Sequence, residues 1–160
     1  RRLSSPWVGA CVDVGNSFAL LEDPLAVVEA YAPWAFSVHL KDQAVQESAD
    51  GFLFGDAALG RGFLDLKRMV PALRQAKPDV RFSLEVITRD PLQVPCLTEK
   101  YWATLSDVPG SDLARTLRTV RAHAQKTLPR VSELPPADRA EFEEQNIRQS
   151  LAYARTELGM

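Results

Sequence analysis

At 160 residues, 46% hydrophobic and 25% charged, the chain has the length and composition of one ordinary globular domain with a sizeable core. A formal net charge of -2, no long apolar run and no secretory signal exclude nucleic acid and membrane as expected partners. Cys11 and Cys96 form neither a disulfide framework nor a paired metal motif, which favours a reducing compartment, and we expect the cytoplasm.

The first predicted unit pairs a strand at residues 8–13 with a helix at residues 24–32. The strand carries apolar side chains, Cys11 among them, that are typical of a buried strand. Asp23 suits the helix N-cap and Pro24 its first position, because aspartate accepts from free N–H groups and proline lacks one. Strand and helix together form a βα unit.

Two further units are predicted after the first one. Strands are expected at residues 35–40 and 80–87, and a helix begins near Asp65 with Pro71 expected to kink or shorten it. Between them, residues 42–62 form a long loop whose glycines and phenylalanines indicate packing, with room for a short β-hairpin. Three βα units in succession with buried strands predict a parallel sheet.

The pattern changes after the third strand. Residues 88–109 are predicted to be a loop, followed by helices at about 111–125 and 137–158. The inward stripe of the last helix is expected to consist of Ile147, Leu151, Ala154 and Leu158. We therefore expect residues 1–109 to hold the βα units and residues 110–160 to form a helical C-terminal extension packed on them.

Each predicted strand ends in a residue that can bind a metal ion: Asp13, His39 and Glu85. The carboxyl ends of parallel strands meet at one edge of a sheet, which is where α/β folds build their sites. Carboxylate and imidazole ligands suit Mn²⁺, Mg²⁺, Co²⁺ or Zn²⁺. Acids at strand ends also serve as helix caps or salt-bridge partners, so both interpretations remain open from spacing alone.

Five other residues near these strand ends are candidates for substrate binding. Lys41 and Asp42 would contact substrate oxygens or pair with each other. Asn16 and Arg61 are expected near the mouth of the site, where they would bind hydroxyl or phosphate groups. The guanidinium of Arg89 suits a carboxylate or phosphate, or else pairs with the neighbouring aspartate.

Four motifs, in this order and spacing, carry a resemblance to a known family. They are Asp13-Val14-Gly15-Asn16, Val38-His39-Leu40-Lys41-Asp42, Gly60-Arg61-Gly62 and Leu84-Glu85. Over about residues 5–90 the chain resembles the sugar phosphate isomerase/epimerase family, the xylose isomerase-like TIM barrels of the AP endonuclease family 2 superfamily. The resemblance implies a partial (β/α)8 barrel, namely its last three βα units with parallel strands, plus the helical C-terminal extension.

The family resemblance also implies a function. Members with this pattern hold one divalent metal with Glu, Asp, His and Glu, of which the last three match Asp13, His39 and Glu85. The first glutamate would lie on an earlier strand, so we expect a C-terminal part of a barrel that is inactive alone. The implied activity is a sugar, sugar acid or sugar phosphate isomerase or epimerase, in which Glu85 moves a proton next to a carbonyl through an enediolate.

Other functions fit the same motifs. A lyase or dehydratase of the inosose or dehydroshikimate type would share the metal, and a barrel relative without catalysis would share the fold. Asn16 stands where many relatives have histidine and Arg61 where many have glutamate, which leaves the substrate open. Histidines are too few for the DNA-repair endonuclease of the superfamily. Three strands leave two unpaired edges, so we expect a poorly stable chain or association as a homo-oligomer.

Overall fold

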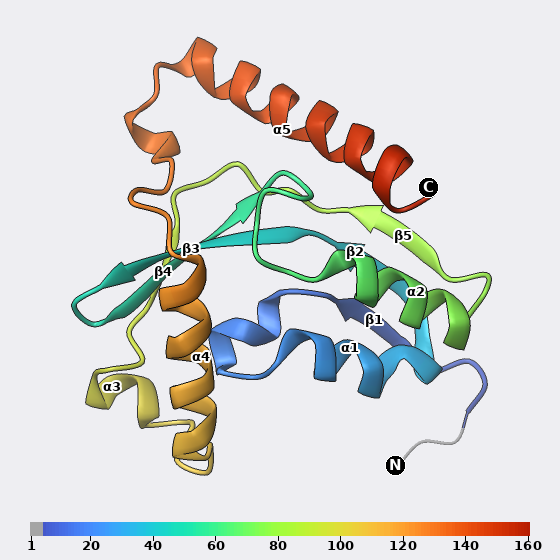
Figure 1. Cartoon of the computed structure of the whole chain (residues 1–160), viewed down its shortest axis with the longest axis horizontal. Coiled ribbons are helices and arrows are strands. Elements are labelled where there is room, and N and C mark those ends of the chain that lie inside the picture. Colours follow the sequence, from blue (N-terminus) through green and yellow to red (C-terminus); the bar gives the residue numbers. More distant parts are fainter. Residues whose placement is uncertain (1–4) are drawn as a thin grey trace.

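A parallel sheet of three strands forms the centre of the computed structural model, which describes residues 5–160 (Figure 1). Its strand order is β1 (Ala10–Asp13), β2 (Ala35–Leu40) and β5 (Arg81–Leu84). Both pairings are parallel, and the register puts Asp13 beside His39. The predicted parallel sheet is therefore confirmed, although β1 and β5 are shorter than the expected strands.

Two helices connect these strands and cover one side of the sheet (Figure 1). The first, α1 (Pro24–Tyr31), begins as predicted, with Asp23 accepting hydrogen bonds from two backbone N–H groups of its first turn. The second, α2 (Leu66–Ala76), continues past Pro71, which is exposed and does not end the helix. The core between sheet and helices includes Val12, Val28, Val38, Leu40, Met69, Val70 and Leu73.

The opposite side of the parallel sheet is open. Cys11, His39, Arg81 and Ser83 are exposed there, and Cys11 is therefore not the core residue that the sequence predicts. Among residues 5–160, β1 and β5 each pair with β2 alone. These are the unpaired edges and uncovered inner face expected of part of a (β/α)8 barrel.

A second sheet replaces most of the loop predicted after β2. It has the order β3 (Asp42–Ser48), β4 (Gly51–Ala57) and β6 (Leu92–Val94), all antiparallel. Aromatic side chains on alternate positions of β4 give it one buried face, as expected for a hairpin strand. Gly51, at the turn, has φ of 145°, a conformation that other residues rarely adopt.

The helix α4 (Gly110–His123) packs on this hairpin and closes a second core. That core consists of Phe18, Leu21, Val45, Phe52, Phe54, Val94, Cys96 and Val120. The backbone N–H of Gln125 donates to the carbonyl of Val45 at 2.9 Å, which ties the end of α4 to β3. Short helices occupy the remaining connections: η1 (Asn16–Leu20), η2 (Ala32–Trp34), α3 (Glu99–Trp102) and η3 (Val131–Glu133).

The last helix, α5 (Pro136–Glu157), crosses from the hairpin side back to α2. The predicted inward stripe is only half right, because Ala154 and Leu158 are buried whereas Ile147 and Leu151 are exposed. The fully buried Ser150, one turn before Ala154, accepts a hydrogen bond from the N–H of Leu59. Within residues 5–160, no helix combines the length and apolar character needed to cross a bilayer.

Candidate metal and substrate site

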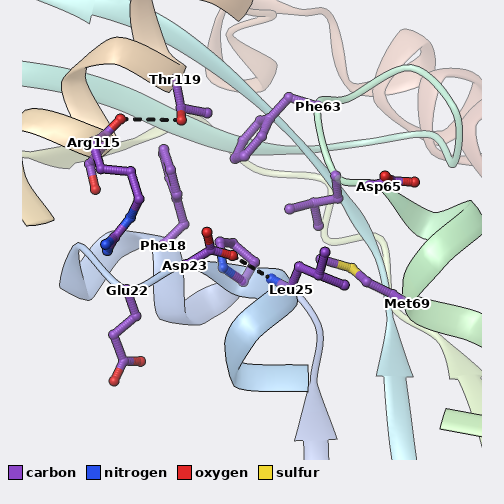
Figure 2. A pocket seen from close by; sticks show the side chains of 12 residues that line it. Phe18, Glu22, Asp23, Leu25, Phe63, Asp65, Met69, Arg115 and Thr119 are labelled. Atoms are coloured by element: carbon purple, nitrogen blue, oxygen red, sulfur yellow. Dashed lines mark hydrogen bonds between the residues drawn. The ribbon is translucent and has the colours of Figure 1, made fainter. Parts of the chain in front are cut away.

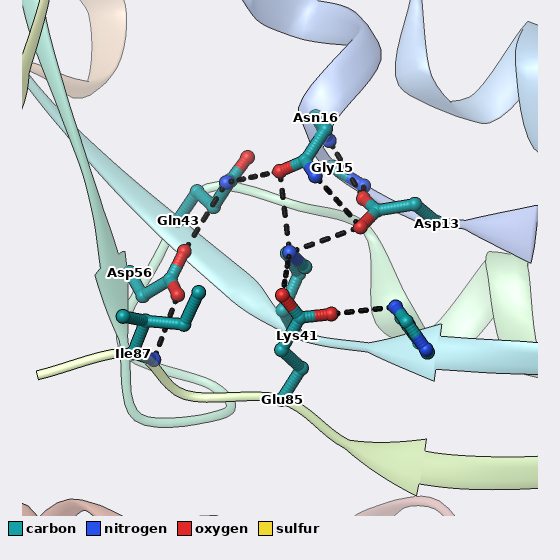
Figure 3. Close-up of polar contacts among 9 residues, drawn as sticks. Asp13, Gly15, Asn16, Lys41, Gln43, Asp56, Glu85 and Ile87 are labelled. Atoms are coloured by element: carbon teal, nitrogen blue, oxygen red, sulfur yellow. Dashed lines mark hydrogen bonds and ion pairs between the residues drawn. The ribbon is translucent and has the colours of Figure 1, made fainter.

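The carboxyl ends of the three parallel strands bring Asp13, His39 and Glu85 together (Figure 3). Each side chain offers one ligand atom, and these atoms lie within 4.8 Å of one another. His39 Nδ1 is 2.7 Å from Glu85 Oε2. The structure thus groups the three residues that the sequence singles out, and this group has the dimensions of a site for one metal ion.

Lys41 lies between the two acids and has almost no exposed side-chain surface, 1%. Its Nζ is 2.9 Å from Asp13 Oδ2 and 3.0 Å from Glu85 Oε1, and it donates to Asn16 Oδ1 at 3.2 Å. Burial acts to lower the pKa of Lys41, but its hydrogen bonds to the two acids and their charges outweigh burial and raise it. Lys41 is therefore a fixed cation with an acceptor for each ammonium proton.

Asp13 has two further sets of contacts. Its Oδ1 accepts from the backbone N–H groups of Gly15 and Asn16, at 3.0 and 2.8 Å, so it also caps the turn into η1. Its Oδ2 accepts from Asn16 Nδ2 at 2.9 Å in addition to Lys41. Asp13 can therefore cap the turn and pair with Lys41 and still bind a metal ion, because these contacts hold its carboxylate in one orientation.

Asp42 has a different environment from Lys41. Its carboxylate is buried and accepts four backbone hydrogen bonds. The donors are the N–H groups of Gln43, Gly60, Gly62 and Leu64, at 2.9, 2.9, 2.9 and 3.1 Å. Burial raises the pKa of Asp42, and these four donors oppose that shift. Because its carboxylate is buried, unlike that of Asp13, and is surrounded by these donors, we assign Asp42 to holding the glycine loop, and not to substrate or to Lys41.

The residues present suit a divalent cation. Glu85 Oε2 is shielded from solvent and accepts no hydrogen bond from the described residues, so it is available as a ligand. Its closest neighbour, His39 Nδ1, forms an ion pair with it only when the imidazole is protonated. One imidazole and two carboxylates make a mixed N/O donor set suited to Mn²⁺, Co²⁺, Zn²⁺ or Mg²⁺.

Arg61 and Arg89 lie outside the metal group but line one common cavity. Arg89 also lines a second cavity, of about 280 Å³, together with Asn16 and Tyr101. The expected alternative partner of Arg89 is the adjacent Asp90, which instead accepts from the N–H and hydroxyl of a serine in η3. Arg89 thus stands beside the polar network of the metal group without belonging to it.

Two residues of this network carried no signal of their own in the sequence. Gln43 donates to Asn16 at 3.4 Å and to Asp56 at 3.3 Å, and Asp56 also accepts from the N–H of Ile87 at 2.8 Å. The hairpin register places Gln43 directly opposite Asp56. Only the pairing of β3 with β4 brings them together. The contact could therefore have been predicted only from the full register of the hairpin.

A cavity of about 160 Å³ elsewhere in the molecule contains none of the predicted site residues (Figure 2). It lies between η1, the starts of α1 and α2, and α4, and its walls include Phe18, Phe63 and Met69. Asp23 and Asp65 also line it, but each already accepts backbone hydrogen bonds at a helix start. It therefore offers no group of ligands comparable to the strand-end site.

Comparison with known proteins decides the family. The sequence pattern of the xylose isomerase-like TIM barrel matches residues 1–108. The chain belongs to this family. Three parallel strands with their connecting helices, and polar ligands at the strand ends, are the part of such a barrel that this chain holds.

One curated relative of this xylose isomerase-like chain is an enzyme, the 3-oxo-isoapionate decarboxylase of Pectobacterium atrosepticum. The two sequences are 34% identical over 85 residues, which cover 52% of this chain. The match spans only about a third, 31%, of the length of that decarboxylase. No solved structure matches the chain significantly.

Proposed function

We propose that the chain carries the metal-binding end of an enzyme that forms an enediolate from a small sugar, sugar acid or sugar phosphate, as an isomerase or epimerase. The convergence of Asp13, His39 and Glu85 supports this proposal most strongly. These three residues would hold a divalent cation, which supplies Lewis acidity for an oxygen that becomes negative beside a carbonyl. A further ligand, which we expect to be a glutamate, is not among these three.

The chain's own residues supply the proton-transfer part of the proposal. Glu85 has one oxygen, Oε1, held by Lys41 at 3.0 Å and a second, Oε2, whose neighbour is His39 Nδ1 at 2.7 Å. A carboxylate fixed by one oxygen can take or return a proton in one orientation, which is what a general base needs. Lys41 keeps the two acids in place through its ion pairs with both.

The relative supports decarboxylation as a second candidate. The decarboxylase named above acts on a 3-oxo compound and is similar to this chain over 85 residues. Loss of carbon dioxide from a 3-oxo acid leaves its electron pair on the carbon beside the carbonyl. The product anion is therefore an enolate, which the same site would stabilise. The two reactions differ in whether a proton or carbon dioxide leaves that carbon.

Metal binding to the 160-residue chain tests the site directly. Titration with Mn²⁺, followed by calorimetry, is expected to show one ion per chain. His39→Ala should weaken this binding at least tenfold, because it removes the imidazole ligand. His123→Ala is the matched control, since the second histidine is exposed on α4. Equal Mn²⁺ affinity in the two variants would contradict the proposed site.

Activity distinguishes the two reactions. In D₂O, an isomerase or epimerase incorporates deuterium beside the carbonyl without releasing carbon dioxide, whereas a decarboxylase releases it. An intact barrel enzyme containing this chain is expected to lose either activity in a Glu85→Gln variant that remains folded. Substantial turnover by that variant would remove Glu85 from the mechanism.

A further inference from the structure

Two arginines that have no acidic partner among the described residues line one cavity beside the second sheet. Arg61 comes from the glycine loop after β4, and Arg89 from the segment after β5. Neither guanidinium forms an ion pair or side-chain hydrogen bond within residues 5–160. The same holds for Arg81, Arg118 and Arg155, so the distinctive feature is that Arg61 and Arg89 line the same cavity. Two unpaired cations that line one cavity from separate segments favour a negative group in that cavity.

A third polar group lines the same cavity. The hydroxyl oxygen of Thr88 is shielded from solvent and has no hydrogen-bond partner in the described structure. Burying a hydroxyl without a partner is unfavourable, so the position is suited to a ligand that accepts its proton. Thr88 adjoins Arg89, so donors of two kinds, a hydroxyl and a guanidinium, belong to one stretch of the wall.

The backbone on both sides of the cavity is held in place. Asp42 binds the N–H groups of Gly60 and Gly62, which flank Arg61. Asp56 accepts from the N–H of Ile87, and Asp90 accepts twice from Ser132, at 2.8 and 2.6 Å. A ligand would therefore order little additional backbone on binding, so the loss of conformational entropy that weakens binding to flexible loops is small.

The rest of the wall limits the size and polarity of the ligand. Apolar side chains of Pro91, Leu128 and Phe142 contribute, the last two from the C-terminal extension. Apolar walls strengthen the attraction between guanidinium groups and an anion. The volume of about 160 Å³ is below the range of sites for drug-sized molecules and suits a single small group. Among the described residues, Asp56 is the one acid in the wall, and Gln43 and Ile87 already donate to it.

We propose that Arg61, Thr88 and Arg89 form a binding site for an oxyanion, a carboxylate or phosphate group, between the hairpin, the segment after β5 and the C-terminal extension. The guanidinium forks hold the oxygens, and the Thr88 hydroxyl donates to one of them. The oxyanion is either a free ion or the charged end of a longer sugar-derived molecule, and none of the three residues belongs to the metal group.

Titration of the full chain with inorganic phosphate, followed by NMR at constant ionic strength, tests the site. We expect saturable binding in the native chain and at least a tenfold weaker affinity in Arg61→Gln and Arg89→Gln. Thr88→Val, which keeps the shape of the side chain, should weaken binding severalfold. Arg118→Gln is the control, because this exposed arginine of α4 loses the same charge outside the cavity.

The proposal is overturned if phosphate fails to saturate the native chain, or if Arg118→Gln weakens binding as much as the cavity variants do. Thermal melts of each variant identify any that fails to fold, and Thr88→Val then carries the test. Gluconate separates the two sources. If the site binds the charged end of a longer molecule, the affinity for gluconate should rise with Mn²⁺ and fall in His39→Ala. If it binds a free ion, the affinity for phosphate should be unaffected by either change.

Discussion

Replacing Lys41 with methionine would remove the only cation between Asp13 and Glu85 among the described residues. Methionine keeps much of the length and packing of the lysine stem, so the change isolates the ammonium group. The two carboxylates and the ammonium together carry a charge of about −1, and the variant leaves about −2. We therefore expect the metal-free variant to be destabilised and to bind a divalent cation more tightly than the native chain.

The size of the destabilisation follows from burial. Removing one partner of a fully buried ion pair costs about 3–5 kcal/mol. Lys41 is 1% exposed, but its two partners are 24% exposed and gain some compensation from water. We therefore expect a loss of about 2–3 kcal/mol in the free energy of unfolding at pH 8.

Urea unfolding at pH 8 and pH 11 measures both the loss and its pH dependence. Because the folded pKa of Lys41 is raised above 10.5, its contribution is fully present below pH 10.5 and is lost as the pH rises through the folded pKa. The difference between Lys41→Met and the native chain should therefore shrink at high pH. Lys67→Met is the control, since the Lys67–Glu157 pair is shorter, at 2.6 Å, but exposed and should contribute little. An unchanged unfolding midpoint for Lys41→Met at pH 8 would refute the balancing role of Lys41.

Two other predictions concern packing around the site. A Cβ at position 62 would collide with the Asp42 carboxylate and the Gln43 carbonyl. Gly62→Ala should therefore lower the free energy of unfolding by about 2 kcal/mol or more. A Cβ at position 110 meets open space, so Gly110→Ala should leave the urea midpoint nearly unchanged. Equal midpoints for the two variants would argue against the assigned loop role of Asp42. Burial raises the pKa of Tyr101 to about 12, and its hydroxyl donates to a backbone carbonyl at 2.6 Å. Below pH 10, Tyr101→Phe should lower the free energy of unfolding by about 1 kcal/mol. The native chain should lose stability between pH 10 and 12 as the hydroxyl ionises, whereas the variant should not, and urea unfolding across that range would detect the difference.

The parallel sheet and its first helix were predictable because their signals are local. The start of α1 at Asp23-Pro24 and the bounds of β2 depend on residues that are adjacent in sequence. The grouping of Asp13, His39 and Glu85 followed from one topological rule, that parallel strands end at a common edge. Local pattern and topology together therefore sufficed for this half of the site.

The remaining features depend on contacts between distant segments. The buried position of Asp42 requires the glycine loop to fold back onto it, and the sequence does not show which N–H groups reach its carboxylate. Leu151 is exposed because α5 turns Ser150, Ala154 and Leu158 inward, where Ser150 accepts a hydrogen bond from the N–H of Leu59. Tertiary contacts of this kind have no local signature.

The passage of one extended segment through both sheets has a mechanical consequence. From Ala35 to Ser48 the backbone belongs to β2 and then to β3, with only Lys41 between the two ladders. The connector after α4 is hydrogen-bonded to β3. It donates to the carbonyl of Val45 and to the side chain of Gln46. Lys41 is therefore the junction at which the hairpin can change its angle to the parallel sheet. We therefore expect a change in connector length to shift the hairpin relative to the parallel sheet and to displace the ammonium of Lys41.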